Sequence, residues 1–121
     1  MGKQEWMVIL PDKPGALDAR MKVRSEHLNN IKPHVESGLV VLGGASLDEP
    51  LREGQSPKIN GSVMMAEADT VDEVWQWVRN DIYYTTGVWD IEKVRAMCGN
   101  HLDEKLMNNT NRSRSSLSRA P

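Results

Sequence analysis

The chain has 121 residues, of which 39% are hydrophobic and 26% are charged, and its formal net charge at pH 7 is −2. This length fits one domain, and the composition is typical of a soluble globular protein rather than a disordered or membrane protein. The slightly acidic balance predicts no nucleic-acid partner, because phosphate binding needs a concentrated basic surface. No stretch approaches the roughly 18 apolar residues of a membrane span, so we expect no membrane partner.

The single cysteine and the three histidines indicate the cellular compartment and whether a metal ion binds. Cys98 is the single cysteine, and residues 1–6 lack the apolar run of a signal peptide. We therefore expect a cytoplasmic protein with a structural thiol. The histidines His27, His34 and His101 lack the compact spacing of a metal site, and no glycine-rich phosphate-binding motif occurs. The sequence predicts no metal and no cofactor.

The first half of the chain predicts a strand, a helix and a second strand. Residues 5–10 form a short apolar run that Pro11 ends, followed by a turn at residues 12–15. A helix is predicted from residue 16 to about residue 32, and we expect Pro33 either to end it or to kink it before one further turn up to Gly38. Its apolar residues at helical spacing are Leu17, Met21, Leu28 and Ile31. Residues 39–42 are typical of a buried strand, closed by the glycine pair at 43–44.

The second half predicts a loop, a strand, a helix and a last strand. Residues 45–60 are rich in proline, glycine and charge and indicate a mobile loop of the kind that covers a site. Residues 61–68 return to an extended apolar pattern, and Thr70 can cap the helix that follows, with Glu73 completing a capping box. We expect that helix to bury Val71, Val74, Trp75 and Val78, to leave Trp77 more exposed and to stop at residues 80–81. The β-branched residues from 88 to 97 favour a fourth strand.

The element order is therefore β-α-β-β-α-β. This order is that of the ferredoxin-like, α+β plan, in which two helices cover one face of an antiparallel sheet. Because the other face is rich in apolar residues, we expect a homodimer that packs sheet on sheet as a dimeric α+β barrel. Residues 1–98 form the predicted domain. Residues 99–121 predict a disordered tail, whose Arg-Ser-Arg-Ser-Ser run at 112–116 is either a solvated end or a phosphorylation or docking site.

The first helix carries the most informative spacing. Arg20, Arg24 and His27 stand at i, i+4 and i+7, which places two guanidiniums and an imidazole on one face. Two permanent cations can hold an anion beside the side chain that titrates near neutrality, an arrangement suited to proton transfer on a small acid or phenol. The alternative is that these side chains have no functional role. The helix face is then merely solvated, or Arg20 pairs with acids near Asp18 and Arg24 pairs with Asp81.

Several short motifs over residues 5–96 are specific when taken together. They are Arg20, Val23-Arg24-Ser25-Glu26-His27-Leu28, Leu42-Gly43-Gly44, Gly61-Ser62-Val63-Met64, Glu67, Asn80-Asp81-Ile82-Tyr83 and Gly87-Val88. In these motifs the chain resembles the YCII-related (YciI-like) family. The resemblance implies a ferredoxin-like dimeric α+β barrel, with a histidine and an aspartate as an active-site pair. These correspond to His27 and Asp81, although Ile82 stands where the family usually has proline.

The resemblance also implies a lyase or isomerase, since the family's characterised chemistry is loss of HCl from a chlorinated hydroxyquinol. In this chemistry His27 acts as acid and base, and a carboxylate orients it. Asp81 is the first choice for that carboxylate and Asp12 the second, with Asp48 and Glu36 also available. His34 is a possible second base or an ordinary surface histidine.

The remaining candidates would bind substrate. Arg20 and Arg24 have the fork geometry that suits planar oxyanions, and Asp12 lies in a turn where the family often has an acid. Ser62, Tyr83 and Trp89 either line the site or only pack and bond the backbone.

These residues lead to two functional hypotheses. The first is a cofactor-independent lyase or isomerase that acts on a small acidic molecule, aromatic or polyketide-like, of secondary metabolism. The second is a non-catalytic dimer that binds a small molecule or serves assembly.

Overall fold

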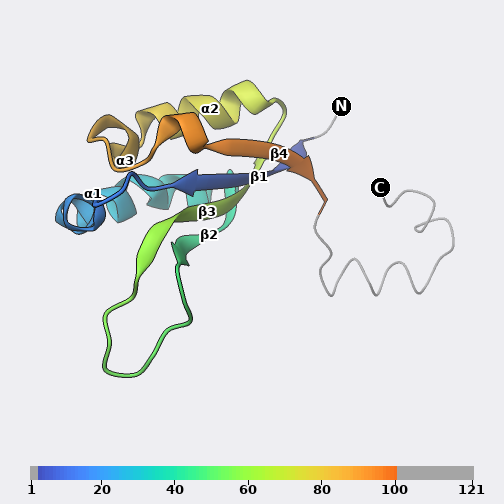
Figure 1. The fold of residues 1–121 in the computed structure, drawn as a ribbon. Coiled ribbons are helices and arrows are strands. Elements are labelled where there is room, and N and C mark those ends of the chain that lie inside the picture. The colour runs from blue at the N-terminus through green and yellow to red at the C-terminus, as the bar shows by residue number, and fades with distance from the viewer. Residues whose placement is uncertain (1–2, 101–121) are drawn as a thin grey trace, which may run out of the picture.

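The computed structural model describes residues 3–100, which form a four-stranded antiparallel sheet with helices on one face (Figure 1). The strand order is β2-β3-β1-β4, which is the order of the ferredoxin-like plan. The predicted β-α-β-β-α-β order is confirmed, with a short helix α3 and one 3-10 turn added before β4. Within the described residues, no helix is both long and apolar enough to cross a bilayer.

The two central strands supply the floor of the core. Strand β1 (Gln4–Pro11) pairs with β3 (Ile59–Ala68) along its whole length, from Gln4↔Ala68 to Pro11↔Gly61. Because successive side chains point to opposite faces, Val8 and Leu10 are buried under the helices while Met7 points the other way.

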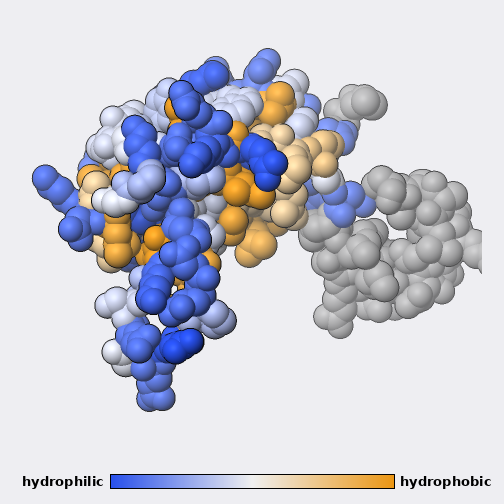
Figure 2. Space-filling model, in the orientation of Figure 1, coloured by the Kyte–Doolittle hydropathy of each residue, from blue (hydrophilic) through white to orange (hydrophobic). Residues whose placement is uncertain are grey.

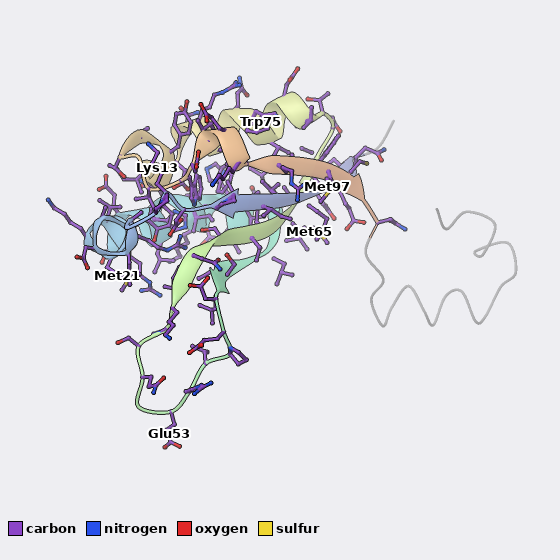
Figure 3. The ribbon with its side chains drawn as sticks, in the orientation of Figure 1. Lys13, Met21, Glu53, Met65, Trp75 and Met97 are labelled. Atoms are coloured by element: carbon purple, nitrogen blue, oxygen red, sulfur yellow. The ribbon has the colours of Figure 1, made fainter. Side chains whose placement is uncertain are left out.

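Helix α2 (Val71–Asn80) begins at the predicted cap. The Thr70 hydroxyl accepts from the Glu73 amide at 3.4 Å, and Val74 and Val78 are buried as expected. The expectation for the tryptophans was wrong: Trp77 is buried and Trp75 is only half-buried. The helix is rolled so that Trp77 meets the aromatic residues of the core, and Trp75 lies on its outer side (Figure 3).

Helix α1 (Leu17–Glu36) is not ended by Pro33 and includes the further turn that the sequence left open. Pro33 lies inside it, and the helix continues to Glu36. Pro33 removes only one backbone donor in the last turn, and its carbonyl still accepts from the Ser37 amide at 2.9 Å.

Of the apolar residues at helical spacing in α1, Leu17, Met21 and Leu28 are exposed, and Ile31 packs against the core. The side of the helix that packs on the sheet is instead lined by buried Arg20 and half-buried His27.

Strand β2 (Val40–Leu47) does not stop at the glycine pair. Neither Gly43 nor Gly44 has a positive φ, so both continue the strand, which pairs with β3 from Val40↔Ala66 to Leu47↔Ile59. The connection that follows is therefore shorter than the predicted loop. Residues 48–58 form an arm that projects from the body of the molecule, with Glu53 near its tip (Figures 1 and 3).

The last described residues differ from the predicted fourth strand. Residues 88–97 do not form one strand: Trp89 makes an isolated bridge with Asp12, a 3-10 turn covers Ile91–Lys93, and β4 (Arg95–Gly99) follows. Cys98 is exposed on β4 rather than buried. Gly99, which was placed in the tail, pairs with Glu5, and the rest of the predicted tail, from residue 101, lies outside the described residues.

The open face of the sheet carries apolar side chains. Met7, Leu42, Val63 and Met97 are 42%, 67%, 41% and 46% exposed, respectively. Figure 2 shows orange side chains gathered over the strands above the largely hydrophilic arm.

Gly61 faces Pro11 at the end of the β1–β3 pairing, where there is no room for a side chain. A Cβ atom there would lie 2.6 Å from the Leu10 carbonyl oxygen, which is backbone and cannot move aside. We expect Gly61→Ala to lower the free energy of unfolding by about 1–3 kcal/mol, the usual cost of overpacking. Urea unfolding measures this cost, with Gly44→Ala as the control because a Cβ there meets nothing within 4 Å. Equal losses in the two variants would contradict the steric argument.

Candidate functional site

A cavity of about 880 Å³ lies between α1, β2, β3 and the arm. Its walls are mainly apolar, with polar groups from four elements facing it. Of the predicted site residues, the following line the cavity: Arg20, Arg24, His27, Ser62, Tyr83 and Trp89. Asp12 and Asp81 stand directly behind this lining, each bonded to one of its members.

His27 and Asp81 are in contact. The His27 Nδ1 atom lies 2.9 Å from Asp81 Oδ1, and the two side chains are 13% and 2% exposed. Since a carboxylate only accepts hydrogen bonds, this contact assigns the ring proton to Nδ1 when the imidazole is neutral. Nε2 then lacks a hydrogen and has no hydrogen-bond partner within residues 3–100. Nε2 is the nitrogen left for a ligand in the cavity that His27 lines.

Asp81 is held in place by the local fold. It ends α2 and is the N-cap of α3 (Ile82–Thr85), where its Oδ1 accepts the Tyr83 amide at 2.8 Å. A short polar residue at an N-cap normally makes this bond. Ile82 is the first residue of α3, the position at which proline is favoured in helices. The family's usual proline and this chain's Ile82 are thus both compatible with the same cap.

Tyr83 lies between the histidine and an arginine. Its ring stacks on His27 with centroids 4.0 Å apart and an interplanar angle of 14°, and the Arg20 guanidinium carbon lies 4.6 Å from its centroid. Arg20 and His27 are two helical turns apart on α1, and both contact the Tyr83 ring.

The Tyr83 hydroxyl is a neutral donor that faces the cavity. Burial raises the pKa of the phenol above its ordinary 10.0, although Arg20 and Arg24 act in the opposite direction. Its hydroxyl has no partner among the described residues. No fully buried side-chain oxygen or nitrogen there lacks one, so this hydroxyl is not fully buried, and Tyr83 is part of the cavity lining.

Arg20 is the centre of a buried polar network. Its Nη1 donates to both carboxylate oxygens of Asp12 at 2.9 and 3.1 Å, and its Nη2 donates to Ser62 Oγ at 2.8 Å. Trp89 Nε1 donates to the same Ser62 oxygen at 3.2 Å. Burial raises the pKa of the Asp12 carboxyl above its ordinary 3.8, and Arg20 lowers it by less.

This network decides between the alternatives for the acids. Asp12 pairs with Arg20 and not with His27, so it is not the orienting carboxylate, and Arg20 is not paired near Asp18. Asp48 accepts from the Asn60 amide on the arm side of the sheet.

Arg24 differs from Arg20. It is exposed, lines the cavity and has no hydrogen-bond or ion-pair partner within residues 3–100, so the alternative pairing with Asp81 is not present. Its guanidinium is therefore available to an anion.

The positions of Trp77 and His34 near the cavity were not predicted from the sequence. Trp77 lines the cavity, yet its place in the helical pattern gave no sign of this. His34 is half-buried edge-on to Trp77 at 6.4 Å and is not part of the lining. In the described part of the chain, no three His, Cys, Asp or Glu side chains gather as a metal site would require.

A protein-family model shows to which family the chain belongs. The model of the YCII-related domain matches residues 5–98. This chain belongs to the YCII-related family. The resemblance drawn from the motifs around His27 and Asp81 is thereby confirmed.

Curated relatives of this YCII-related chain are fungal proteins of biosynthetic clusters. "Fusaric acid biosynthesis protein 2" of Gibberella fujikuroi is 35% identical over 91 residues, which cover 75% of this chain and 88% of the relative. "Xenovulene A biosynthesis cluster protein asL2" of Sarocladium schorii is 32% identical, covering 80% and 90%. "Derivative of benzaldehyde biosynthesis cluster protein C" of Emericella nidulans is 38% identical, covering 69% and 86%.

A solved structure shares the fold. The 5-chloro-2-hydroxyhydroquinone dehydrochlorinase TftG from Burkholderia phenoliruptrix, in complex with 2,5-dihydroxybenzoquinone, superimposes with a TM-score of 0.69. The match covers 81% of this chain and 95% of TftG at 24% identity. It confirms the predicted α+β fold, in which helices cover one face of an antiparallel sheet.

The buried ion pair predicts a large, coupled effect on stability. Arg20→Met leaves the Asp12 carboxylate buried without its partner, so we expect it to lower the free energy of unfolding by about 3–5 kcal/mol. Adding Asp12→Asn removes that stranded charge, and the double variant should recover part of the loss. Chemical unfolding of Arg20→Met, Asp12→Asn and the double variant measures the coupling.

The control is an exposed ion pair of the same chain. Lys58 lies 3.2 Å from Glu49, with side chains 60% and 36% exposed. Lys58→Met should cost no more than about 1 kcal/mol. A similarly small cost for Arg20→Met would show that the buried pair is not needed for folding.

Proposed function

We propose that this protein is a cofactor-independent lyase or isomerase that uses His27 as general base and acid on a small acidic, aromatic or polyketide-like molecule. The observation that carries the proposal is the 2.9 Å contact between His27 Nδ1 and Asp81, with the other ring nitrogen left to the cavity. A carboxylate on one imidazole nitrogen fixes the tautomer and stabilises the imidazolium that forms when the other nitrogen takes a proton.

In the elimination, His27 Nε2 removes a proton from a carbon of the substrate. The electrons of that C–H bond form a new C=C bond, and a leaving group departs from the neighbouring carbon with its bonding electron pair. The imidazolium then loses the proton to solvent or to the leaving group. In the isomerisation no group leaves, and the imidazolium returns the proton at a different carbon. Neither route needs an oxidant or a reductant.

The surrounding residues have separate roles in this proposal. Arg24, which has a free guanidinium at the cavity, binds the substrate's carboxylate or phenolate. Tyr83 donates a hydrogen bond to an oxygen on which negative charge develops. Arg20, Ser62 and Asp12, predicted as binding residues, act as positioning residues because they are bonded to one another.

The comparisons support the same class of chemistry. TftG is named as a dehydrochlorinase and was solved with a hydroxylated quinone, a small acidic ring. The curated relatives are named for biosynthesis or for biosynthesis clusters, where such substrates are plausible metabolites.

The proposal includes a homodimer. The apolar side chains of the open sheet face are too exposed for a face that stays in water, and a second copy would cover them sheet on sheet.

The dimer is tested by charging the open face. Met7→Lys places an ammonium at the middle of the sheet, and we expect it to shift sedimentation from dimer to monomer. Leu28→Lys is the matched control, since Leu28 is 44% exposed against 42% for Met7 but lies on α1. A dimer that survives Met7→Lys, or a monomeric parent protein, would exclude this interface.

Catalysis is tested with hydroxylated quinones and aromatic acids in deuterated water, followed by NMR for elimination, isomerisation or deuterium incorporation. We expect His27→Gln to reduce turnover by about 10²-fold or more while binding is kept. Asp81→Asn should reduce it as well, because the amide no longer fixes the tautomer. His34→Gln, on the same helix but outside the cavity lining, is the control. Binding without turnover in the parent protein, or full turnover in His27→Gln, would favour the non-catalytic reading.

A further inference from the structure

Helix α1 packs polar side chains against the sheet and exposes apolar ones. The side that packs against the sheet carries Arg20 and His27, whereas Leu17, Met21 and Val35 are 39%, 51% and 52% exposed. These apolar residues repeat at i, i+4 and i+18, so they form one stripe along the helix, to the side of its packed face. The stripe lines the same cavity as His27. Apolar side chains that line a concave site, and are not needed for the core, indicate an apolar ligand part.

The strand register places a second apolar wall opposite the start of this stripe. On β2 and β3, Ala45 pairs with Ser62, which is bonded to Arg20. Nearer the arm, Leu47 pairs with Ile59, and both line the cavity. The polar floor therefore gives way to an apolar region in the direction of the arm.

We call this region the arm sector. It consists of Leu17 and Met21 from α1, Leu47 and Ile59 at the base of the arm, and Leu51 and Pro57 on the arm. Figure 3 shows Met21 extending from the first turns of α1 toward the side from which the arm projects. The polar side chains of the cavity lining that adjoin this sector are Asp18 and Ser56, so the sector is mainly but not wholly apolar.

The size of the cavity fits the same conclusion. Its volume of about 880 Å³ lies near the upper end of the roughly 300–1,000 Å³ that hold drug-sized ligands. A single substituted ring on Arg24 and His27 fills only a small part of it. The remaining space adjoins the arm sector.

We propose that the ligand is amphipathic: an anionic ring or carboxylate held by Arg24 beside His27, with an alkyl or acyl chain of several carbons lying in the arm sector between α1 and the arm. This inference rests on the proposed function for the head of the molecule and adds the chain. A second copy of the protein is a weaker candidate for this region, since the sheet face that a dimer would cover lies on the other side of the sheet. The arm sector is also continuous with the His27 site through one cavity.

The probes are 4-n-alkylbenzoates from methyl to hexyl, and their dissociation constants are measured by calorimetry on the full chain. Each methylene that leaves water should tighten binding by about three- to fourfold. Met21→Gln and Leu51→Gln should flatten this dependence on chain length. Val35→Gln should preserve it, because Val35 has the same exposure as Met21 but lies at the far end of α1. Arg24→Gln should weaken every member by a similar factor, since it removes the contact with the head.

Three results would overturn the inference. One is affinity that is independent of chain length, or absent for the whole series. Another is a dependence that Val35→Gln removes and Met21→Gln does not, which would place the chain elsewhere. The third is a change in sedimentation for Met21→Gln and Leu51→Gln, which would make the sector a protein interface. The chain-length series repeated with His27→Gln separates the two proposals: a retained dependence without any turnover in the parent protein supports the chain and rejects the enzyme.

Discussion

The arrangement of the site depends on one buried cation. Arg20 brings together the end of β1 through Asp12, the start of β3 through Ser62 and the segment after α2 through the ring of Tyr83. A buried guanidinium is tolerated only if its donors are satisfied, so these segments cannot separate without stranding a charge. The interaction fixes the wall on which Tyr83, and through it the ring of His27, is stacked.

Asp81 links folding to the proposed chemistry through one atom. Its Oδ1 accepts both the Tyr83 amide, which begins α3, and the His27 ring nitrogen. The cap fixes the carboxylate independently of any ligand, and the fixed carboxylate sets the tautomer of the histidine. Preorganisation of this kind needs no movement when a substrate binds, which is the condition for efficient proton transfer.

In helix α1 the requirements of the site and those of core packing differ. A helix built only for packing would bury Leu17, Met21 and Leu28, whereas here they are exposed and Arg20 is buried. Such a departure from ordinary patterning is expected where function, and not stability, decides the sequence. The partnership of Arg20 with Asp12 was not predicted from the sequence.

The sequence by itself determined the order of elements and the family, because periodicity, caps and local motifs are properties of neighbouring residues. The pairing of His27 with Asp81, 54 positions apart, was expected only from the family resemblance. The sequence also located the Thr70 cap and the open apolar face. Only the tertiary structure decided how far α1 and β2 run, that Trp77 and not Trp75 is buried, and that Arg24 remains free while Arg20 does not. Those outcomes depend on how one element rolls against another and on contacts between residues such as Arg20 and Ser62, 42 positions apart. Spacing along the chain carries no information about such contacts.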